Sequence, residues 1–287
     1  MKTGFIGLGA MGAPMAGHLH ARGLLAVVGN RTASKASALA AQLGGGVLAA
    51  HDAAAFAGCD VVMLCVSADA DVLQQVDALA AVLAPGALVV DHSTVASGTA
   101  VEAARRLAAR GIGFLDAPVS GGVEGARNGK LSVMVGGEAD ALERARPALE
   151  AYALRITHMG AHGAGQATKA VNQVLVAGIA QAVCEGLALG EALGLDPERL
   201  IPTLGAGAAG NWFLEKRGAT MLRDEFAVGF KLALLHKDLR IVEGMARDAG
   251  LRATVIPQSL ADYAALMAEG HGDDDISGLI RRKRAPR

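Results

Sequence analysis

The sequence of 287 residues predicts an α/β protein with a doubly wound parallel sheet at the N-terminus, one long interdomain helix, and an all-helical C-terminal domain. Three observations predict this fold class. Short, continuously apolar runs alternate with helical stretches through the first half of the chain. Residues 166–193 then contain almost no helix breaker. Everything after them is helical in pattern.

The apolar runs are the predicted strands. They cover residues 3–8, 24–29, 60–66 and 87–92, and the later runs 113–119 and 131–137 are expected to extend the same sheet. Continuous rather than alternating hydrophobicity is typical of strands that are buried on both faces. Helical stretches lie between the runs, up to about residue 22, near 34–43 and over 69–83. Strands that alternate with helices predict a parallel sheet.

The second half has a different character. The long helix over residues 166–193 ends at Gly194, and Pro197 opens the next helix, which is the usual punctuation of helices. Further helices are expected over residues 197–204, 231–249 and 254–268. We therefore expect a nucleotide-binding type of domain at residues 1–162 and an all-helical domain at residues 163–287, which would line the substrate cleft and support oligomerisation.

Composition excludes two classes of partner. Hydrophobic residues make up 52% of the chain but aromatic residues only 3%, so few side chains could stack on bases. The net charge of −1 provides no broad basic field for DNA or an anionic membrane. We expect a small-molecule partner, no nucleic acid and no membrane. The basic tail, residues 281–287, is interpreted as a solvated terminus rather than a lipid or nucleic-acid contact.

Cysteine usage and the N-terminus indicate the cytoplasm. The three cysteines, Cys59, Cys65 and Cys184, show no paired spacing, so no disulfide framework is expected. Glycines interrupt the apolar N-terminal segment, which argues against a signal peptide. We also expect no membrane span, because polar residues break every long apolar stretch.

A glycine motif follows the first predicted strand. Gly7, Leu8, Gly9, Ala10, Met11 and Gly12 form a G-x-G-x-x-G that follows a strand and opens a helix. In this context the motif predicts a Rossmann-like dinucleotide site, with the pyrophosphate at the positive end of the helix. The alternative is a purely structural turn between strand and helix.

The end of the second strand indicates the cofactor. NAD-preferring sites usually place Asp or Glu there to bind the ribose 2′-hydroxyl, but this chain has Asn30, Arg31 and Thr32. Asn30 carries no charge that would repel a 2′-phosphate, while Arg31 and Lys35 could pair with it. We therefore expect NADP(H), with NAD(H) less favoured. The alternative is that Arg31 and Lys35 are ordinary surface charges.

Several motifs, in order, resemble the β-hydroxyacid dehydrogenase family. The opening segment at residues 4–19 resembles the family's first motif, and DHST at 91–94 its cofactor-side loop. DAPVSGG at the start of residues 116–137 resembles the substrate-binding segment. GAGQATKAVNQ at 163–173 resembles the start of the catalytic helix, and HKDL at 236–239 the element that reaches the nicotinamide side.

The resemblance covers nearly the whole chain, but two positions depart from the common pattern. His18 stands where Asn is common, a change expected to affect packing. Gln173 stands where a second Asn often follows Asn172, and this version resembles tartronate semialdehyde reductases more than mammalian-type 3-hydroxyisobutyrate dehydrogenases. The family also includes glyoxylate and succinic semialdehyde reductases, and its members form dimers or tetramers, so a homodimer or homotetramer is expected.

Lys169 is the candidate catalytic residue. Oxidation of an alcohol by a nicotinamide needs a group that accepts the hydroxyl proton, and reduction needs the same group to return it. An apolar surround and a nearby positive nicotinamide would lower the pKa of a lysine enough for this role. Asn172 and Gln173 lie on the same helix face and are expected to contact the substrate. The alternative for Lys169 is a solvated charge.

The remaining candidate site residues lie in other segments of the chain. Ser120, Gly121 and Gly122 offer a hydroxyl and open backbone N–H groups to a substrate carboxylate. Cys65, Val66, Thr94 and Lys237 complete the expected cofactor contacts. No metal site is expected, because glycines separate His158 from His162 and the acidic run 273–275 is interpreted as the cap of a last helix near Ile276.

The expected function is NADP(H)-dependent interconversion of a small 3-hydroxy acid and its semialdehyde. Two alternatives remain at this stage. An imine reductase on the same scaffold is one, although those enzymes commonly lack the lysine seen at Lys169. A non-catalytic NADP-binding scaffold protein is the other, and the combination of the glycine loop with Ser120, Lys169 and Lys237 argues against it.

Overall fold

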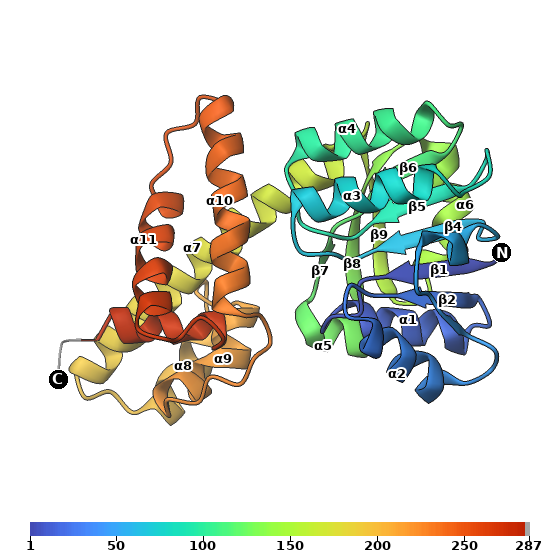
Figure 1. Cartoon of the computed structure of the whole chain (residues 1–287). Helices are drawn as coiled ribbons and strands as arrows, with labels where there is room; N and C mark the ends of the chain where they lie inside the picture. Colours follow the sequence, from blue (N-terminus) through green and yellow to red (C-terminus); the bar gives the residue numbers. More distant parts are fainter. Residues whose placement is uncertain (285–287) are drawn as a thin grey trace. The chain divides into compact units, whose positions relative to one another are not determined.

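The computed structural model describes residues 1–284 and contains two compact units (Figure 1). The first unit runs from Met1 to Lys169, and the second begins at Ala170. This division falls inside the long helix, after the boundary expected near residue 162.

Within the described residues, the strands of the first unit form one nine-stranded sheet. Its order is β3-β2-β1-β4-β5-β6-β8-β7, with β9 paired to β8. The strands are β1 (Thr3–Ile6), β2 (Leu25–Gly29), β3 (Leu48–Ala49), β4 (Val61–Leu64), β5 (Leu88–Asp91), β6 (Gly113–Asp116), β7 (Val119–Ser120), β8 (Leu131–Gly137) and β9 (Ala153–Gly160). Strands β2 and β3 are added on one side of β1, and β4 and β5 on the other. The strand order therefore changes direction between β1 and β4, and this switch point is where such sheets bind nucleotides.

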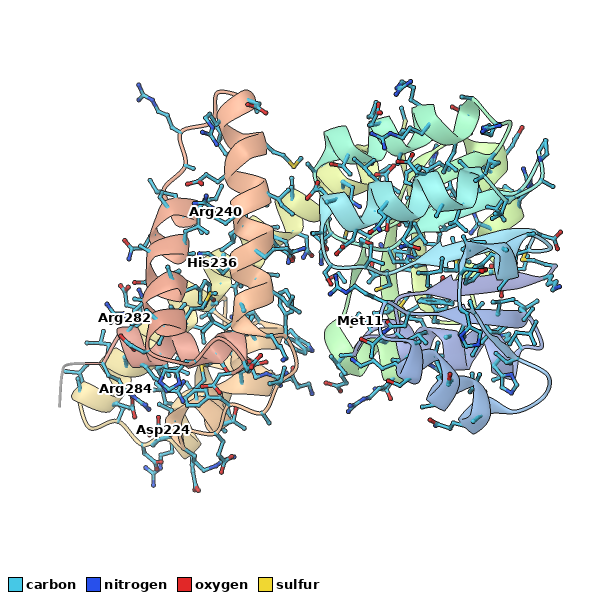
Figure 2. The ribbon with its side chains drawn as sticks, in the orientation of Figure 1. Met11, Asp224, His236, Arg240, Arg282 and Arg284 are labelled. Carbon is cyan, nitrogen blue, oxygen red and sulfur yellow. The ribbon has the colours of Figure 1, made fainter. Side chains whose placement is uncertain are left out.

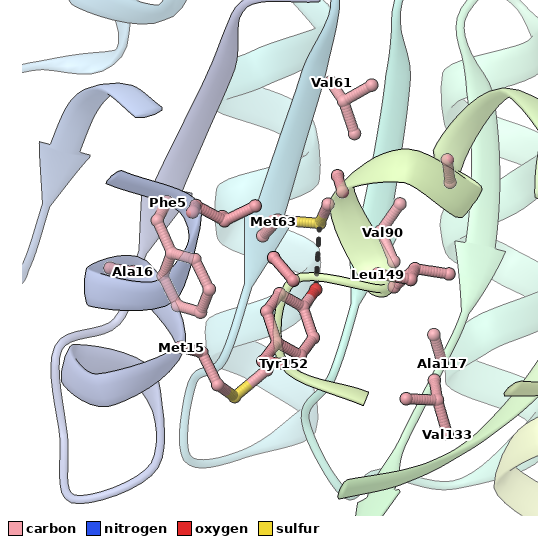
Figure 3. Packing of buried hydrophobic residues seen from close by; sticks show 14 of the residues in the cluster. Phe5, Met15, Ala16, Val61, Met63, Val90, Ala117, Val133, Leu149 and Tyr152 are labelled. Atoms are coloured by element: carbon pink, nitrogen blue, oxygen red, sulfur yellow. Dashed lines mark hydrogen bonds between the residues drawn. The ribbon is translucent and has the colours of Figure 1, made fainter. Parts of the chain in front are cut away.

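Helices cover both faces of this sheet. They are α1 (Gly12–Ala21), α2 (Ala33–Leu43), α3 (Asp69–Ala80), α4 (Ser97–Ala108), α5 (Gly122–Arg127), α6 (Ala139–Leu149) and the 3-10 helix η1 (Ala53–Phe56). Phe5, Met63 and Val90 pack with Met15 of α1 and Tyr152 on one face (Figure 3). The neighbouring strand residues, such as Ile6, Leu64 and Val89, pack with α3 and α4 on the other. Continuous apolar runs are required because alternate residues enter two separate cores.

The doubly wound prediction is therefore confirmed, with two corrections. The run at residues 131–137 does extend the sheet, but as β8 it lies antiparallel to β6 and β7. Strand β9 was not predicted. All of its residues are exposed or half-buried, so the sequence ALRITHMG lacks the continuous apolar pattern that marked the inner strands.

The second unit is helical. The long helix α7 (Ala164–Ala192) begins in the first unit and continues into the second, followed by α8 (Pro197–Gly205), α9 (Trp212–Leu222), α10 (Leu232–Asp248), α11 (Val255–Ala268) and the 3-10 helix η2 (Ile276–Arg282). Asp196 caps α8, whose first residue is Pro197, and Asp275 caps η2 as expected from the acidic run. Helix α9 was not predicted; Asn211 caps it by accepting from the Leu214 N–H.

Helix α7 meets the length and composition of a membrane-spanning helix. Its buried residues Ala177, Ala180, Cys184 and Leu187 nevertheless pack into the core of the second unit with α9, α10 and α11. That packing is the behaviour of a core helix in a globular protein.

The described part of the basic tail is not a free solvated terminus, which corrects the expectation. Arg281 pairs with Asp274, Lys283 with Asp262, and Arg284 with both Glu191 and Asp224, so these cations tie η2 to α7, α11 and the α9 C-terminal loop. Figure 2 labels Arg284 and Asp224. The Lys283 and Arg284 side chains are only 11% and 17% exposed. Residues 285–287 of the expected tail lie outside the described residues.

Candidate functional site

The glycine loop lies at the switch point of the sheet. Gly7 has φ +99°, and a Cβ there would collide with the Cys65 carbonyl oxygen at the end of β4. A Cβ at Gly12 would collide with the Gly7 carbonyl, whereas one at Gly9 would meet nothing within 4 Å. The outer glycines are therefore needed for packing, and the middle one faces open space where a pyrophosphate could approach. Helix α1 begins directly after the loop without a side-chain cap or an acidic residue in its first turn. The loop fits a dinucleotide phosphate.

Asn30 supports this loop from the end of β2. Its Oδ1 accepts from the Leu8 N–H at 2.9 Å, and its Nδ2 donates to the Thr32 carbonyl at 3.2 Å. The expectation for Asn30 was the absence of a charge that would repel a 2′-phosphate. In the structure the Asn30 side chain also holds the glycine loop to the end of the second strand.

Arg31 and Lys35 lie on the surface beside this loop. The Arg31 side chain is 84% exposed and makes a 3.5 Å ion pair with Asp71 at the start of α3. Lys35 is exposed in the first turn of α2, which has no acidic residue in that turn and no side-chain cap at Thr32. An exposed ion pair of this length is weak, so the guanidinium can exchange Asp71 for a phosphate at little cost.

The loops after β4 and β5 are joined to each other. The Val66 N–H donates to Ser93 Oγ at 2.9 Å, and the Ser93 N–H donates to Asp91 Oδ1 at 2.9 Å. Cys65 continues β4, with its N–H donating to the Ile6 carbonyl. Cys65, Val66 and Thr94 are all half-buried at the carboxyl edge of the sheet, where the glycine loop also lies.

Asp91 and His92 are buried but do not form a relay. His92 Nδ1 donates to the Ala117 carbonyl at 2.7 Å, and its Nε2 lies 2.8 Å from the Tyr152 hydroxyl. Burial lowers the pKa of His92 to about 4, against the opposing effect of its hydrogen bond to Ala117. Burial likewise raises the pKa of Asp91 to about 6, against its hydrogen bonds with Ser93. Because Asp91 and His92 hydrogen-bond to different partners, they do not act together as two members of a catalytic triad.

Lys169 and the expected carboxylate anchor come together within the first unit. The Lys169 side chain is only 8% exposed, and its Nζ donates to the Val119 carbonyl at 2.8 Å. Ser120 follows Val119 in β7, and Gly121 and Gly122 adopt φ +129° and +61° as the chain turns into α5. Only glycine adopts both conformations readily, so the backbone at this turn is specified by the sequence.

Asn172, Gln173 and Lys237 belong to the second unit and are joined by a residue that sequence analysis missed. Asn172 Nδ2 donates to Gln173 Oε1 at 2.7 Å, and Gln173 Nε2 donates to Asp238 Oδ2 at 2.7 Å. Asp238 Oδ1 lies 2.8 Å from Lys237 Nζ. The buried Asp238 thus links α7 to α10. The HKDL motif contains this aspartate, but nothing in the motif indicates its partner on α7.

Two further buried polar residues, Asp116 and Gln166, were also missed. Both hold the first turn of α7 and are 0% and 1% exposed. The signal available in the sequence was a polar residue inside each of two motifs, Asp116 in DAPVSGG and Gln166 in GAGQATKAVNQ. Their partners are backbone groups brought together only by the fold.

Other candidates have structural roles. His18 Nε2 contacts the carbonyls of Ala126 and Arg127, which joins α1 to α5. His158 and His162 contact the carbonyls of Gly137 and Phe114, and within residues 1–284 no cluster of three metal-ligating side chains is found. Trp212 is 55% exposed, lies 5.3 Å from the Arg217 guanidinium and lines a surface hollow formed by α8 and α9.

Comparison with known proteins agrees with this geometry. A family model described as the NAD binding domain of 6-phosphogluconate dehydrogenase matches residues 2–160. A second, described as "NAD-binding of NADP-dependent 3-hydroxyisobutyrate dehydrogenase", matches residues 163–282. The first unit is thus a domain that binds a nicotinamide dinucleotide.

Whole-chain relatives include dehydrogenases. The chain is 37% identical to an NAD-dependent L-serine dehydrogenase of Pseudomonas aeruginosa, over 96% of this chain and 95% of the relative. It is 32% identical to 2-(hydroxymethyl)glutarate dehydrogenase of Eubacterium barkeri, over 98% and 94%. The solved structure of Mycobacterium tuberculosis 3-hydroxyisobutyrate dehydrogenase with L-serine superposes with a TM-score of 0.88 at 34% identity and covers 99% of both chains. The chain belongs to the β-hydroxyacid dehydrogenase family and is an oxidoreductase of hydroxy acids.

Proposed function

We propose that this enzyme interconverts a small 3-hydroxy acid and its semialdehyde with NADP(H), and that Lys169 is the general acid/base. One observation carries the proposal. The nearly buried Lys169 ammonium is hydrogen-bonded to Val119, directly before Ser120, Gly121 and Gly122. An amine in this position can exchange a proton with a hydroxyl whose carboxylate is held by the adjacent turn.

The residues divide the chemistry among them. When bound, the nicotinamide supplies or accepts the hydride. Lys169 returns the proton to the substrate oxygen in the reducing direction and removes it in the oxidising direction. Ser120 and the backbone N–H groups of Gly121 and Gly122 bind the substrate carboxylate. Asn172 and Gln173, further along the same helix, are proposed substrate contacts.

The names of the relatives narrow the substrate class. L-Serine, 3-hydroxyisobutyrate and 2-(hydroxymethyl)glutarate each carry a hydroxymethyl group on the carbon next to a carboxylate. We propose that this chain acts on an acid of the same form, with a primary hydroxyl one carbon from the carboxylate-bearing carbon. The substituent on that carbon distinguishes the relatives' substrates.

NADP(H) is the proposed cofactor because of the end of β2. Arg31, Thr32 and Lys35 present two cations and a hydroxyl, with no carboxylate among them to bind a ribose 2′-hydroxyl. The glycine loop, Cys65, Val66 and Thr94 are the other proposed contacts of the cofactor, and Lys237 is proposed on the nicotinamide side. The Pseudomonas relative is NAD-dependent, so the preference for NADP(H) over NAD(H) is tested by kinetics with both cofactors.

We further propose a cytoplasmic homodimer or homotetramer. Large apolar side chains on α7 are exposed, at 61% for Val171, 60% for Leu175, 60% for Leu189 and 65% for Leu193. Apolar side chains repeated along one helix are typical of protein–protein contacts.

A substrate panel tests the proposed function. The purified enzyme is assayed with NADP⁺ and NAD⁺ on 3-hydroxyisobutyrate, L-serine and 2-(hydroxymethyl)glutarate, and with NADPH and NADH on semialdehydes and glyoxylate. Turnover of a hydroxymethyl acid or its aldehyde is expected. A cyclic imine is assayed with NADPH in the same panel, and its reduction without turnover of any hydroxy acid would favour an imine reductase. Cofactor binding without turnover on any substrate would favour a binding protein.

A further inference from the structure

The first turn of α7, which leads to Lys169, is held by a buried carboxylate at the end of β6. Asp116 is 0% exposed; its Oδ1 accepts from the Gly163 N–H at 2.8 Å and its Oδ2 from the Gln166 N–H at 2.9 Å. Two of the backbone donors at the start of the helix are therefore satisfied by one side chain that belongs to the sheet.

Two glycines make room for this carboxylate. A Cβ at Gly136 would lie 2.5 Å from Asp116 Oδ1, and a Cβ at Gly165 would lie 2.9 Å from Oδ2. The Gly165 Cβ would also lie 2.5 Å from the Met134 carbonyl and 2.6 Å from the Asp116 carbonyl. The turn thus rests directly on the backbones of β6 and β8, so its distance from the sheet is fixed.

Gln166 connects the same turn to the loop after β5. Its side chain is 1% exposed; Nε2 donates to the Ser93 carbonyl at 2.8 Å and Oε1 accepts from the Val95 N–H at 3.2 Å. These two groups flank Thr94, a proposed cofactor contact. Ser93 is in turn held by Asp91 and by the Val66 N–H. The Gln166 side-chain amide thus fixes the start of α7 to the loop after β5, at the carboxyl edge of the sheet.

We infer that Asp116 and Gln166 are positioning residues that set the height and rotation of α7, and through it the place of the Lys169 amine at Val119. The inference rests on the proposed function of Lys169. Gln166 and Lys169 are three positions apart, so they lie on neighbouring parts of one helix face. A shift of this turn moves the amine relative to the substrate turn, and a misplacement of about 1 Å can lower turnover about 10²-fold.

Replacement of Gln166 by Met separates positioning from folding. Met has nearly the same volume but makes neither hydrogen bond, so Gln166→Met is expected to lower kcat at least about tenfold with the fold retained. Gln181 provides a matched control on the same helix, because its Nε2 donates to Ser259 and Asp262 within the second unit. Gln181→Met is expected to lower the melting temperature while kcat stays within about twofold of wild type.

Gln166→Glu supplies a pH readout that a merely structural role would not produce. A protonated glutamic acid can replace the amide, since its C=O accepts from Val95 and its O–H donates to Ser93, whereas the carboxylate repels the Ser93 carbonyl. The titratable groups in this network are Asp91 at the end of β5, Asp116 at the end of β6 and Lys169 on α7. The ratio of variant to wild-type kcat is expected to rise as pH falls, by up to about tenfold per unit, and the ratio for Gln166→Met is expected to stay flat.

A third readout needs no cofactor. In the free enzyme, an amine-acylating reagent followed by peptide mass spectrometry is expected to label Lys169 several-fold faster in Gln166→Met than in wild type, because the side chain is released from its buried position. Wild-type kcat in Gln166→Met, or a pH-independent ratio in Gln166→Glu together with unchanged labelling, would overturn the inference. Full activity of Lys169→Ala would instead overturn the proposed function on which it rests.

Discussion

Asp91 and His92 are adjacent and buried, and burial shifts their pKa values in opposite directions. Replacement of one residue should therefore reveal the pH dependence of stability that the other contributes. The neutral His92 ring donates from Nδ1 to Ala117 and accepts at Nε2 from the Tyr152 hydroxyl. Protonation of Nε2 would force that hydroxyl to turn toward Met63 Sδ, which lies 3.7 Å away (Figure 3). Asp91 Oδ2 has no hydrogen-bond partner in the described structure, so burial favours its neutral form.

The shifts set the magnitude and sign. The Asp91 pKa rises from 3.8 to about 6, so the folded state holds a proton that the unfolded state has lost, and stability falls as pH rises through this window. The His92 pKa falls from 6.5 to about 4, so the unfolded state holds the extra proton, and stability rises with pH between 4 and 6.5. At 1.36 kcal/mol per pKa unit, each contribution amounts to about 3 kcal/mol. The two nearly cancel in the wild type.

Asp91→Asn keeps the shape and the acceptor for the Ser93 N–H but cannot titrate. The variant's free energy of unfolding, measured in urea at several pH values, is expected to rise by about 3 kcal/mol from pH 4 to 6.5 relative to the wild-type profile. The measurement is made without cofactor, because ligand binding would add its own pH dependence. Parallel profiles for wild type and Asp91→Asn would refute the burial argument for Asp91.

Three further predictions concern ligands and assembly. The kcat/KM for NADPH is expected to exceed that for NADH, and Arg31→Ala should raise the KM for NADPH several-fold with little effect on NADH; a higher kcat/KM for NADH in wild type would contradict the cofactor assignment. Gly122→Leu places a bulky side chain at φ +61° in the proposed carboxylate anchor. The KM for the acid should therefore rise strongly, while NADPH affinity stays within a few fold of wild type. Loss of cofactor affinity with unchanged acid affinity would instead assign this turn to the cofactor site. Light scattering at micromolar concentration should give a multiple of the 29.0 kDa chain mass, and a 29 kDa particle would exclude the proposed oligomer.

Local signals were sufficient to predict the sheet and the cofactor loop. The inner strands are covered on both faces, which forces continuous apolar runs, and the three glycines of the loop are each explained by a backbone neighbour or by open space. Lys169 and Ser120 were proposed as site residues from motifs, and the fold brings their segments together at Val119.

The residues that escaped prediction depend on contacts distant in sequence. Asp116 and Gln166 lie inside motifs, but they bind backbone groups from other segments, and no local pattern indicates those partners. Asn30 was interpreted by its charge alone, but it also contacts Leu8 on another strand's loop. The basic tail was taken for a solvated terminus because its partners, such as Glu191 and Asp224, are remote in the chain (Figure 2). In each case the partner is distant in the chain, so the local sequence did not indicate it.

The role of Lys169 is tested most directly by the turnover of Lys169→Ala with saturating acid and NADP⁺, alongside NADPH affinity measured by fluorescence. Lys231→Ala is the matched control, since this lysine is 46% exposed and pairs with Asp273 within the second unit. If Lys169 is the general acid/base, Lys169→Ala is expected to lose about 10²–10⁴-fold in kcat while NADPH affinity is retained. A variant that keeps more than about a tenth of wild-type kcat would contradict the assignment.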